Sequence, residues 1–378
     1  MKPATVALIG NQAWAVLKFR SRLIETLRAD GYRVVVLAHR DATFERLRPL
    51  CDELIDVKMV LRQISPLGDL RTLAAYWRHL RRLDPFAVLS FSIKPNIYGS
   101  LVCRWLRLPV VNNVTGLGAI ELRSGRVAST VRWLYRRSFS HSHRVFFQNP
   151  QDMQAMLAQA IVGPDQARLL PGSGVDTARF TPAVRAPGDR IRFCMIARLL
   201  RDKGVVEFAE AAGKLRSRHP DLQFDLWGIL DAADPRCVTR AEVAAWEERG
   251  WLGFHGEARD AAQAFEFADV VVLPSFYPEG TPRTLLEAGS MALPCITTDM
   301  PGCRDAVVHE VTGFLCPPRD AGALAEAMMR AVEIGPEGRR AMGERARARI
   351  LTEFDEDIVL AAYRDQLSEI AAEVGLSP

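Results

Sequence analysis

The fold is decided by the stretch Pro274-Ser275-Phe276-Tyr277-Pro278-Glu279-Gly280-Thr281-Pro282-Arg283-Thr284-Leu285-Leu286-Glu287-Ala288. The run before it, residues 269–273, is short, rich in valine and bounded by Pro274, so it predicts a buried parallel strand. Thr281 suits an N-cap and Pro282 the first helical position, which predicts a helix over the residues that follow. A strand that turns directly into a helix is typical of the carboxyl edge of an open α/β sheet, where ligands bind.

Two glutamates in this stretch, Glu279 and Glu287, are separated by seven residues. The first is expected in the loop before the helix and the second within the helix. At the start of that helix the backbone amides of Gly280, Thr281, Arg283 and Thr284 are expected to point outward. Together with the helix dipole they predict a site for an anion, most naturally a phosphate.

This stretch resembles the E-x7-E signature of retaining family-4 glycosyltransferases, which use nucleotide diphosphate sugars and have the GT-B fold. The resemblance implies that Glu279 holds hydroxyls of the donor sugar and that Glu287 holds the nucleotide ribose. A carboxylate suits a vicinal diol because it accepts hydrogen bonds from both hydroxyls. The alternative explanation for two glutamates at this spacing is a solvated helix face. The implied donor-binding residues of this stretch are Gly280, Thr281, Pro282, Arg283, Thr284, Leu285 and Glu287.

Length and composition indicate a globular protein of two domains. A chain of 378 residues exceeds one ordinary core, and its contents of 48% hydrophobic and 25% charged residues are typical of globular proteins. No apolar run approaches the ~20 residues that span a bilayer, and Met1–Gly10 resembles a first strand rather than a signal peptide, so a cytoplasmic location is expected. The seven cysteines are scattered and are expected to be reduced and mostly buried.

Two series of strand signals, with helical segments between them, predict an α/β fold of doubly wound parallel sheets. A polar, proline-rich break near residue 185 separates the two series. The GT-B resemblance implies two Rossmann-like domains that face a central cleft. With the break near residue 185, the resemblance implies an acceptor-binding domain at 1–185, a nucleotide-sugar-binding domain at 186–353 and a C-terminal helix at 354–378 that crosses back to the first domain. The predicted strands are 5–9, 33–38, 87–90, 109–112 and 145–148, then 191–197, 223–227, 252–255, 270–273 and 294–298.

Two cations, Arg198 and Lys203, follow the first strand of the second series. Both are therefore expected at a carboxyl end, beside the Glu279 loop. Arginine can grip a diphosphate with two hydrogen bonds and lysine adds a mobile charge, so the pair suits a departing nucleotide diphosphate without a metal. The family resemblance implies this catalytic role for Arg198 and Lys203 together with Glu279. An ordinary basic loop is the alternative.

Three weaker signals also lie at strand ends. Trp227-Gly228 and His255-Gly256-Glu257 occupy positions where the resemblance implies contacts with the nucleotide base and ribose, so Gly228 and His255 are candidate donor-binding residues. Gly10 comes after the first strand, where a close approach of backbone to the donor phosphate favours glycine. Plain turn glycines explain these positions equally well.

The first domain is expected to bind the acceptor. Two segments resemble a subgroup of the family that extends polyprenyl diphosphate-linked sugars in bacterial surface glycan assembly. One segment, residues 92–99, offers Lys94 and Asn96, and Lys94 at a strand end is suited to a phosphate. The other, residues 112–118, offers a loop that closes on the sugar. The loop residues are Thr115, Gly116, Leu117 and Gly118. Structural roles for all of these residues are the alternative.

Charge is distributed unevenly along the chain. Residues 1–185 contain 27 Lys and Arg against 13 Asp and Glu, whereas the remainder contains 22 against 32. The basic half predicts an anionic partner, and a membrane surface suits it better than nucleic acid because no nucleic-acid module is recognisable. Apolar residues of the segment Arg126–Arg144, among them Val127, Val131 and Tyr135, recur at helical spacing, which fits either an interfacial helix or a helix packed on the sheet with a basic outer face.

The resemblance implies a retaining reaction, in which the leaving phosphate helps to deprotonate the acceptor and Glu279 orients the sugar. No metal is expected: Asp355-Glu356-Asp357 spells D-x-D, but it opens a predicted helix, where acids act as caps. No cofactor is expected beyond the nucleotide-sugar co-substrate. The predicted function is transfer of a hexose or N-acetylhexosamine from a nucleotide sugar, preferably UDP-linked, to a polyprenyl diphosphate-linked sugar by a peripheral membrane protein. A transferase with a soluble acceptor, a nucleotide-sugar epimerase and a non-catalytic nucleotide-sugar-binding scaffold are the alternatives.

Overall fold

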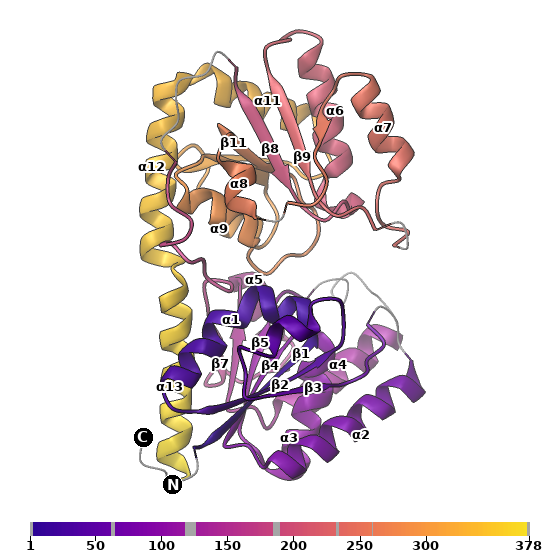
Figure 1. Cartoon of the computed structure of the whole chain (residues 1–378), viewed down its shortest axis with the longest axis vertical. Helices are drawn as coiled ribbons and strands as arrows, with labels where there is room; N and C mark the ends of the chain where they lie inside the picture. The colour runs from indigo at the N-terminus through magenta and orange to yellow at the C-terminus, as the bar shows by residue number, and fades with distance from the viewer. Residues whose placement is uncertain are drawn as a thin grey trace. The chain divides into compact units, whose positions relative to one another are not determined.

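The computed structural model of the chain (Figure 1) describes residues 3–61, 65–117, 126–183, 190–231, 234–258 and 260–375. The chain divides into two compact units: unit 1 is Met1–Ser173 with Val359–Pro378, and unit 2 is Gly174–Ile358. Each unit contains one sheet in which all the strand pairs are parallel, so the predicted pair of doubly wound parallel sheets is confirmed. Within the described ranges no helix is both long and apolar enough to cross a bilayer.

The sheet of unit 1 has the order β3-β2-β1-β4-β5-β6-β7. Because the chain moves outward from β1 in one direction and from β4 in the other, the strand order reverses between these two strands. The loops after β1 and β4 therefore flank the topological switch point. The strands are β1 (Thr5–Gln12), β2 (Arg33–His39), β3 (Glu53–Asp56), β4 (Ala87–Phe91), β5 (Val110–Val114), β6 (Arg144–Phe147) and β7 (Ala167–Leu169).

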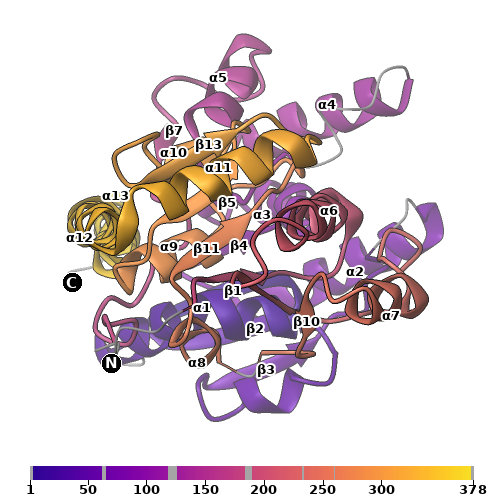
Figure 2. The ribbon, with the colours of Figure 1, turned by 90° about the horizontal axis from the view of Figure 1, so that it is seen from above.

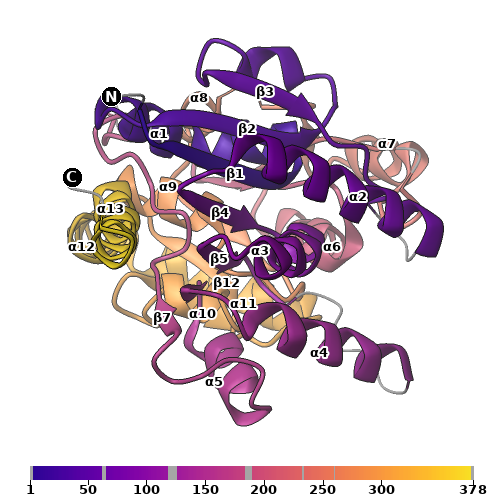
Figure 3. The ribbon, with the colours of Figure 1, turned by 90° about the horizontal axis from the view of Figure 1, so that it is seen from below.

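Helices cover both faces of this sheet. Residues of α1 and α13 share a buried cluster with alternate residues of β1 and β2, such as Val6 and Val34. Residues of α2 and α3 pack against the other set, such as Ala7 and Val35. Figure 3 shows α2, α3 and α4 as neighbours in unit 1. The helices are α1 (Ala13–Ala29), α2 (Pro66–Leu83), α3 (Ser100–Leu106), α4 (Arg126–Phe139), α5 (Pro150–Ala158) and α13 (Glu356–Glu373).

The last helix, α13, packs into unit 1 from Val359 onward. Tyr363 is fully buried in the cluster that contains α1, and its hydroxyl accepts a hydrogen bond from Asn113 Nδ2 at 2.9 Å. At the start of this helix Asp355 accepts the amide of Asp357 at 2.8 Å, so the predicted capping role of this acidic segment is confirmed. Burial of one face of α13 makes it part of the core of unit 1.

The division between the units lies before Gly174, whereas the sequence places it near residue 185, in a range outside the described residues. Residues after 173 belong with unit 2 because Val175 pairs with Phe354 and Glu356, where α13 begins. Its amide donates to Phe354 O at 3.0 Å, and its carbonyl accepts from Glu356 N at 3.0 Å.

The sheet of unit 2 has the order β10-β9-β8-β11-β12-β13. The chain leaves β8 toward β9 and leaves β11 toward β12, in opposite directions, so the switch point lies between β8 and β11. The strands are β8 (Arg192–Ile196), β9 (Gln223–Trp227), β10 (Gly253–Phe254), β11 (Val270–Leu273), β12 (Cys295–Thr298) and β13 (Gly313–Cys316).

Right-handed crossovers in opposite directions put α6 and α9 on opposite faces of this sheet. Helix α11 packs beside α6 (Figure 2), and α9 packs against α8 and α12. One continuous apolar cluster fills unit 2. The helices are α6 (Val205–Arg216), α7 (Arg240–Glu248), α8 (Ala261–Phe265), α9 (Arg283–Ser290), α10 (Cys303–Ala306), α11 (Ala321–Glu333) and α12 (Gly335–Glu353).

Two sequence expectations about strands differ from the structure. Gly10 lies inside β1 rather than after it, because pairing with β2 resumes beyond an irregularity and joins Gln12 to His39. The strands β3, β7 and β13 are absent from the predicted series. They have four, three and four residues and lie at sheet edges, so their sequences carry only a short apolar signal.

Candidate active site at the switch point of unit 2

Two loops flank the switch point of unit 2. The loop after β8 carries Arg198 and a short 3-10 helix, Arg201–Lys203. The loop after β11 carries Glu279. Because the strands are parallel, both loops leave the sheet at its carboxyl edge. The two sequence motifs, about 80 residues apart, therefore lie together as the strand pattern predicts.

The two loops are joined through their backbones. The carbonyl of Asp202 accepts the amides of Phe276 and Tyr277, both at 2.9 Å. Gly204 has a φ of +78°, and a Cβ there would overlap the carbonyl of Pro274, so only glycine permits this close approach. The shape of the Glu279 loop thus depends on the turn that carries Lys203.

Glu279 and Lys203 form an ion pair across the switch point. Each side chain is 14% exposed, and Lys203 Nζ also lies 5.1 Å from the centroid of the Tyr277 ring. Ser275 Oγ donates to Glu279 Oε1 at 3.2 Å. A nearly buried carboxylate that keeps a cation and a hydroxyl as partners is held in a defined orientation, which suits a group that positions a ligand.

The electrostatics of the site favour an anion. Burial, and then the nearby guanidinium of Arg198, lower the pKa of Lys203 to about 8. Arg198 itself is exposed, and in the described part of the chain its guanidinium has no hydrogen-bond or ion-pair partner. Two neighbouring cations both attract a shared anion, so together they bind it more tightly than either does alone.

The second glutamate of the motif lies inside α9. Glu287 is 4% exposed and accepts from Arg283 Nε at 3.1 Å, one helical turn away. The predicted N-cap is wrong by one residue: Pro282, with extended backbone and no side-chain bond, takes the cap position, and the helix begins at Arg283. Thr281 is 8% exposed in the loop before the cap.

The remaining predicted residues of this stretch divide between surface and core. Gly280 and Leu285 are buried, and Thr284 is partly exposed in the first turn of α9. The first amides of a helix have no partner within it, so the start of α9 offers donors to an anion. Leu285 packs in the core of unit 2 and contributes to the scaffold through its side chain.

Gly302 supports the Glu279 loop from the other side. Its φ is +81°, and a Cβ there would overlap the carbonyl of Gly280 and approach that of Glu279. We expect Gly302→Ala to lower the free energy of unfolding of unit 2 by roughly 3 kcal/mol or more, because backbone strain and overlap add. Gly250→Ala is the matched control, since its φ of +66° is also positive but nothing lies within 4 Å of the added Cβ.

The control should lose only about 1–2 kcal/mol, the cost of the left-handed backbone. Urea unfolding followed by tryptophan fluorescence measures both values. Equal losses for the two variants would show that the Glu279 loop does not press on Gly302.

His255 and Gly228 lie at the carboxyl ends of β10 and β9. The His255 ring stacks on Trp227 with centroids 4.6 Å apart, and its Nε2 lies 2.6 Å from Asp225 Oδ1. Gly228 is buried and donates its amide to Gly256 O at 2.7 Å, so its backbone joins the two loops. The 40% exposed imidazole is therefore held in place and available to a ligand at this edge.

In unit 1 the structure places two predicted residues beside the switch point. Gly10 approaches Val16 of α1 so closely that a Cβ would overlap that side chain. Lys94 follows β4, is 16% exposed, and pairs with Asp69 Oδ1 of α2 at 2.7 Å. An acceptor phosphate that binds Lys94 must therefore compete with a buried carboxylate.

The other predicted acceptor residues lie partly in the interior. Asn96 is 1% exposed and donates to Asn113 O at 2.8 Å while it accepts from Asn112 at 3.2 Å, so it belongs to a satisfied buried network. Of the loop residues, Thr115 is exposed, Gly116 is buried with a φ of +112°, and Leu117 is 3% exposed. Gly118 lies outside the described residues.

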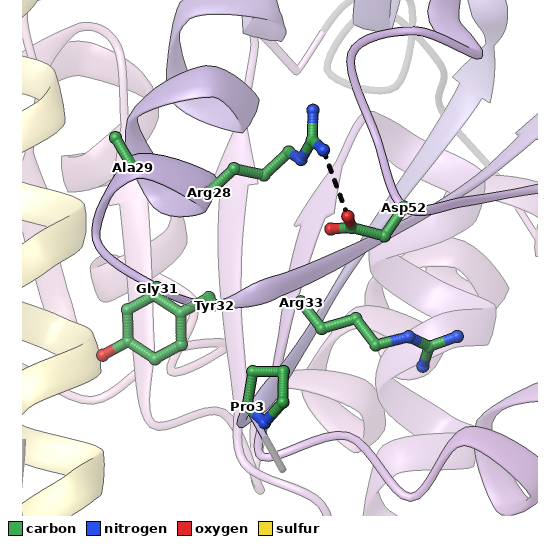
Figure 4. A pocket seen from close by; sticks show the side chains of 7 residues that line it. All are labelled: Pro3, Arg28, Ala29, Gly31, Tyr32, Arg33 and Asp52. Atoms are coloured by element: carbon green, nitrogen blue, oxygen red, sulfur yellow. Dashed lines mark hydrogen bonds and ion pairs between the residues drawn. The ribbon is translucent and has the colours of Figure 1, made fainter.

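A pocket of unit 1 lies at the opposite edge of its sheet (Figure 4). It is lined by residues from the end of α1 and the start of β2, and Arg28 pairs there with Asp52 at 3.2 Å. Because this is the amino edge of the strands, it is not where an open parallel sheet binds ligands. Its arginines are engaged by the protein itself.

The sequence patterns assign no role in the site to Ser275, Asp202, Gly302 or Asp225. Ser275 and Asp202 shape the Glu279 loop, Gly302 supports it, and Asp225 orients His255. Their sequence signals are weak. Ser275 only follows the proline that ends a strand, Gly302 only lies in a turn, and Asp225 only lies on the strand beside the one that precedes His255. Each acts through a partner that is distant in sequence, so no local pattern reveals it.

Two family descriptions match this chain. Residues 18–173 match "Glycosyl transferase 4-like domain", and residues 176–349 match "Glycosyl transferases group 1". The two matches meet at the division between the units, and the second contains every residue of the switch-point site.

Two known proteins are similar over most of their length. The N,N'-diacetylbacillosaminyl-diphospho-undecaprenol alpha-1,3-N-acetylgalactosaminyltransferase of Campylobacter jejuni is 24% identical over 95% of this chain and 96% of its own length. The UDP-Gal:alpha-D-GlcNAc-diphosphoundecaprenol alpha-1,3-galactosyltransferase of Escherichia coli is 27% identical over 75% of this chain and 78% of its own length.

Among solved structures, a glycosyltransferase from Rickettsia africae superposes with a TM-score of 0.81. It is 17% identical and the alignment covers 98% of this chain and 99% of that one. At this identity the likeness concerns the fold, and it extends over both units.

Proposed function

The chain belongs to the glycosyltransferases that join a 4-like domain to a group 1 domain, and we propose that it transfers a hexose or N-acetylhexosamine from a UDP-linked sugar to a polyprenyl diphosphate-linked sugar in surface glycan assembly. The observation that carries the proposal is the meeting of Lys203, Arg198 and Glu279 at the switch point of unit 2. The two relatives named above act, by their names, on sugars carried by a diphospho-undecaprenol, and one of them uses UDP-Gal.

In this mechanism the cations act on the leaving group. Lys203 and Arg198 neutralise the nucleotide diphosphate as the sugar departs, and the first amides of α9 add hydrogen bonds. When the donor binds, before the sugar departs, Lys203 exchanges its contact with Glu279 for the diphosphate. Glu279, released from the ammonium but still held by the hydrogen bond from Ser275, then accepts hydrogen bonds from hydroxyls of the donor sugar. Glu287 holds the ribose, and His255 with Gly228 borders the base.

The reaction retains the anomeric configuration. Retention through a covalent sugar would need a second carboxylate about 5 Å from the first, on the model of retaining glycosidases. Glu287 is instead buried in α9 and paired with Arg283. We therefore assign reaction on one face of the sugar, with the leaving phosphate as the base that takes the acceptor proton. The acceptor binds in unit 1, which works at the cytoplasmic face of the membrane.

The test is release of nucleotide diphosphate from a panel of UDP- and GDP-sugars, with and without a polyprenyl diphosphate-sugar acceptor. We expect acceptor-dependent release of UDP from one donor, with a rate that Glu279→Ala lowers by roughly 10²–10³-fold. Glu279→Gln preserves the shape of the loop and should be nearly as slow. The control Glu248→Ala removes an exposed glutamate of α7 and should be as active as wild type.

The alternatives give different results in the same assay. Conversion of the donor without any acceptor indicates an epimerase, and equal turnover of a short water-soluble acceptor indicates that lipid is not recognised. Binding of UDP-sugars with no turnover on any acceptor contradicts the enzymatic proposal. Proton NMR of the product gives the configuration of the new linkage.

Removal of divalent metal should not slow the reaction, because two cationic side chains and a helix terminus are available to the diphosphate. We expect the rate in excess EDTA to match the rate in magnesium within about twofold. A loss that added magnesium reverses would contradict the proposal that Arg198, Lys203 and the start of α9 stabilise the diphosphate without a metal.

The pKa of Lys203 predicts an alkaline limit to donor use. The ammonium is present below its pKa of about 8 and lost above it. We therefore expect kcat/KM for the UDP-sugar to fall about tenfold per pH unit above pH 8. Lys203→Arg should lower the overall rate but abolish this alkaline limb, because the guanidinium stays charged. Identical profiles for wild type and Lys203→Arg would refute the assignment.

A further inference from the structure

Unit 1 exposes large apolar side chains on α2, α3 and α4. These helices are neighbours (Figure 3), and their exposed surface is here called the α2–α4 face. Each helix contributes an exposed tryptophan: Trp77 of α2 is 40% exposed, and Trp105 of α3 and Trp133 of α4 are both 59% exposed. Leu67 and Leu70 at the start of α2 are 73% and 62% exposed. Three tryptophans exposed on adjacent helices are unusual, because a protein that meets only water gains by burying them.

Helix α2 is apolar on two sides. Its buried side carries Tyr76 and Leu80 into the core of unit 1. Its other side carries Leu67, Leu70 and Trp77, which recur at intervals of three and seven residues and so lie along one stripe of the exposed surface. The core explains the first stripe, whereas the described residues of unit 1 leave the second exposed.

The same helices are strongly basic. Their sequences contain four arginines in α2, one in α3 and four in α4, and a single acid, Asp69. Asp69 is 7% exposed and pairs with Lys94, so it adds no negative charge to the surface. Arg81 lies over the Trp77 ring at 5.0 Å, and Arg71 and Arg81 make no ion pair in the described part of unit 1.

Helix α4 shows which side of the basic segment faces outward. Tyr135 is 1% exposed, and Val131 and Leu134 pack against the same buried cluster. The apolar stripe noted in the sequence therefore points into the core where it is described, and Val127 lies outside the described side chains. Trp133 and Arg137 are left on the outer side.

We propose that the α2–α4 face docks unit 1 on a bilayer of anionic lipid. Tryptophan prefers the level of the headgroups, leucine the acyl region below it, and arginine binds lipid phosphates. The proposal rests on the proposed lipid-linked acceptor and adds to it the surface, and the class of lipid, that bring the enzyme to that acceptor. Within the basic first half of the chain, the proposal places the membrane contact on exposed residues of α2 and α3 as well as α4.

Nucleic acid fits this face less well. Arginine and tryptophan would serve it, but Leu67 and Leu70 would stay in water. A protein partner would cover the apolar residues but would have to supply acids for arginines spread over three helices. A bilayer supplies both an apolar interior and a continuous anionic surface.

The experiment is co-sedimentation of the full chain with vesicles of phosphatidylcholine alone or with 40% phosphatidylglycerol. We expect binding only to the anionic vesicles. The variant Arg71→Glu/Arg81→Glu should bind at least about 25-fold more weakly, since each arginine near an anionic surface contributes about fivefold. The variant Trp77→Ser/Trp105→Ser/Trp133→Ser should bind the anionic vesicles at least roughly tenfold more weakly than wild type.

Matched controls lie in unit 2. Arg218→Glu/Arg240→Glu reverses two exposed arginines, and Phe267→Ser removes an aromatic side chain that is 64% exposed and stacked with Arg192. Both controls should bind vesicles as wild type does. All substitutions are at exposed positions, and circular dichroism verifies that the variants fold.

Each outcome decides the proposal. Undiminished vesicle binding by both α2–α4 variants overturns it, as does binding to single-stranded oligonucleotides in preference to anionic vesicles. Transfer to a short-chain, water-soluble diphosphate-sugar acceptor, measured without vesicles, reports the proposed function separately. Variants that keep this transfer but lose vesicle binding support both proposals, whereas vesicle binding without any transfer contradicts the proposed function alone.

Discussion

Lys203→Ala is expected to lower kcat for sugar transfer by roughly 10³-fold. Lys203 is 14% exposed, contacts Glu279 and carries the charge that the departing diphosphate requires. A preorganised cation in a site with little water contributes several kcal/mol to a transition state in which charge develops, because no solvent has to reorganise. The effect should appear mainly in kcat, since the charge on the leaving oxygen grows as the bond breaks.

The neighbouring residue Arg201 provides the control. It lies in the same 3-10 turn, but its guanidinium is 47% exposed and pairs with Glu242 on α7. Arg201→Ala should therefore change kcat by less than about threefold. Steady-state kinetics of UDP release with saturating acceptor measures both variants. Equal kcat losses for the two would show that general basicity of the loop, rather than the position of Lys203, supports the reaction.

A stability effect of Lys203→Ala is expected as well. The substitution leaves the Glu279 carboxylate nearly buried without its ammonium partner, and removal of one member of a buried pair costs about 3–5 kcal/mol. Glu279→Gln/Lys203→Ala should recover part of this loss, because no charge then remains to be desolvated. Activity should not recover, and this difference separates the catalytic role of Lys203 from its structural one.

Deletion of residues 359–378 is expected to unfold unit 1. Five apolar side chains of α13 are each at most 4% exposed within the core of that unit. Burial contributes about 2 kcal/mol for each such side chain, so the helix contributes about 10 kcal/mol, which is comparable to the whole stability of a typical domain. The five side chains are Val359, Leu360, Tyr363, Leu367 and Ile370.

Thermal unfolding and hydrogen exchange check this prediction. Deletion of residues 374–378, which leaves all five side chains in place, is the control and should leave unit 1 folded. Tyr363→Ala should cost about 3–5 kcal/mol and Tyr363→Phe about 1–2 kcal/mol, because the second keeps the ring but leaves the Asn113 amide without its hydroxyl. Native protection of β1 in the longer deletion would contradict the account.

The sequence identifies most strands of the two sheets because their apolar runs are local. β9 lies where the pattern places it, at Gln223–Trp227, and the run before Pro274 forms β11. The sequence pattern does not predict the edge strands β3 and β7, because three or four residues carry little periodicity. The start of α9 moves by one residue because Pro282 fits both the first helical position and the extended cap.

The candidate site divides in the same way. That Arg198, Lys203 and Glu279 lie at one edge follows from parallel strands alone. Parallel strands alone do not predict the contact between Lys203 and Glu279, or the hold of the Asp202 carbonyl on the Glu279 loop. These contacts depend on β8 lying next to β11. Asn96 shows the opposite case: its motif suggests a ligand, yet the structure turns it inward to Asn112 and Asn113.

By itself, therefore, the sequence determined the two parallel sheets, the motif at the carboxyl edge of the second and the basic character of the first half. Each is recorded in residues close together in the chain, through apolar runs, turn residues and local charge. Only the tertiary structure decided the Lys203–Glu279 pair, the burial of α13 in unit 1 and the exposure of Trp77, Trp105 and Trp133. These depend on strand order and helix packing, which join residues distant in sequence and leave no periodic signal along it.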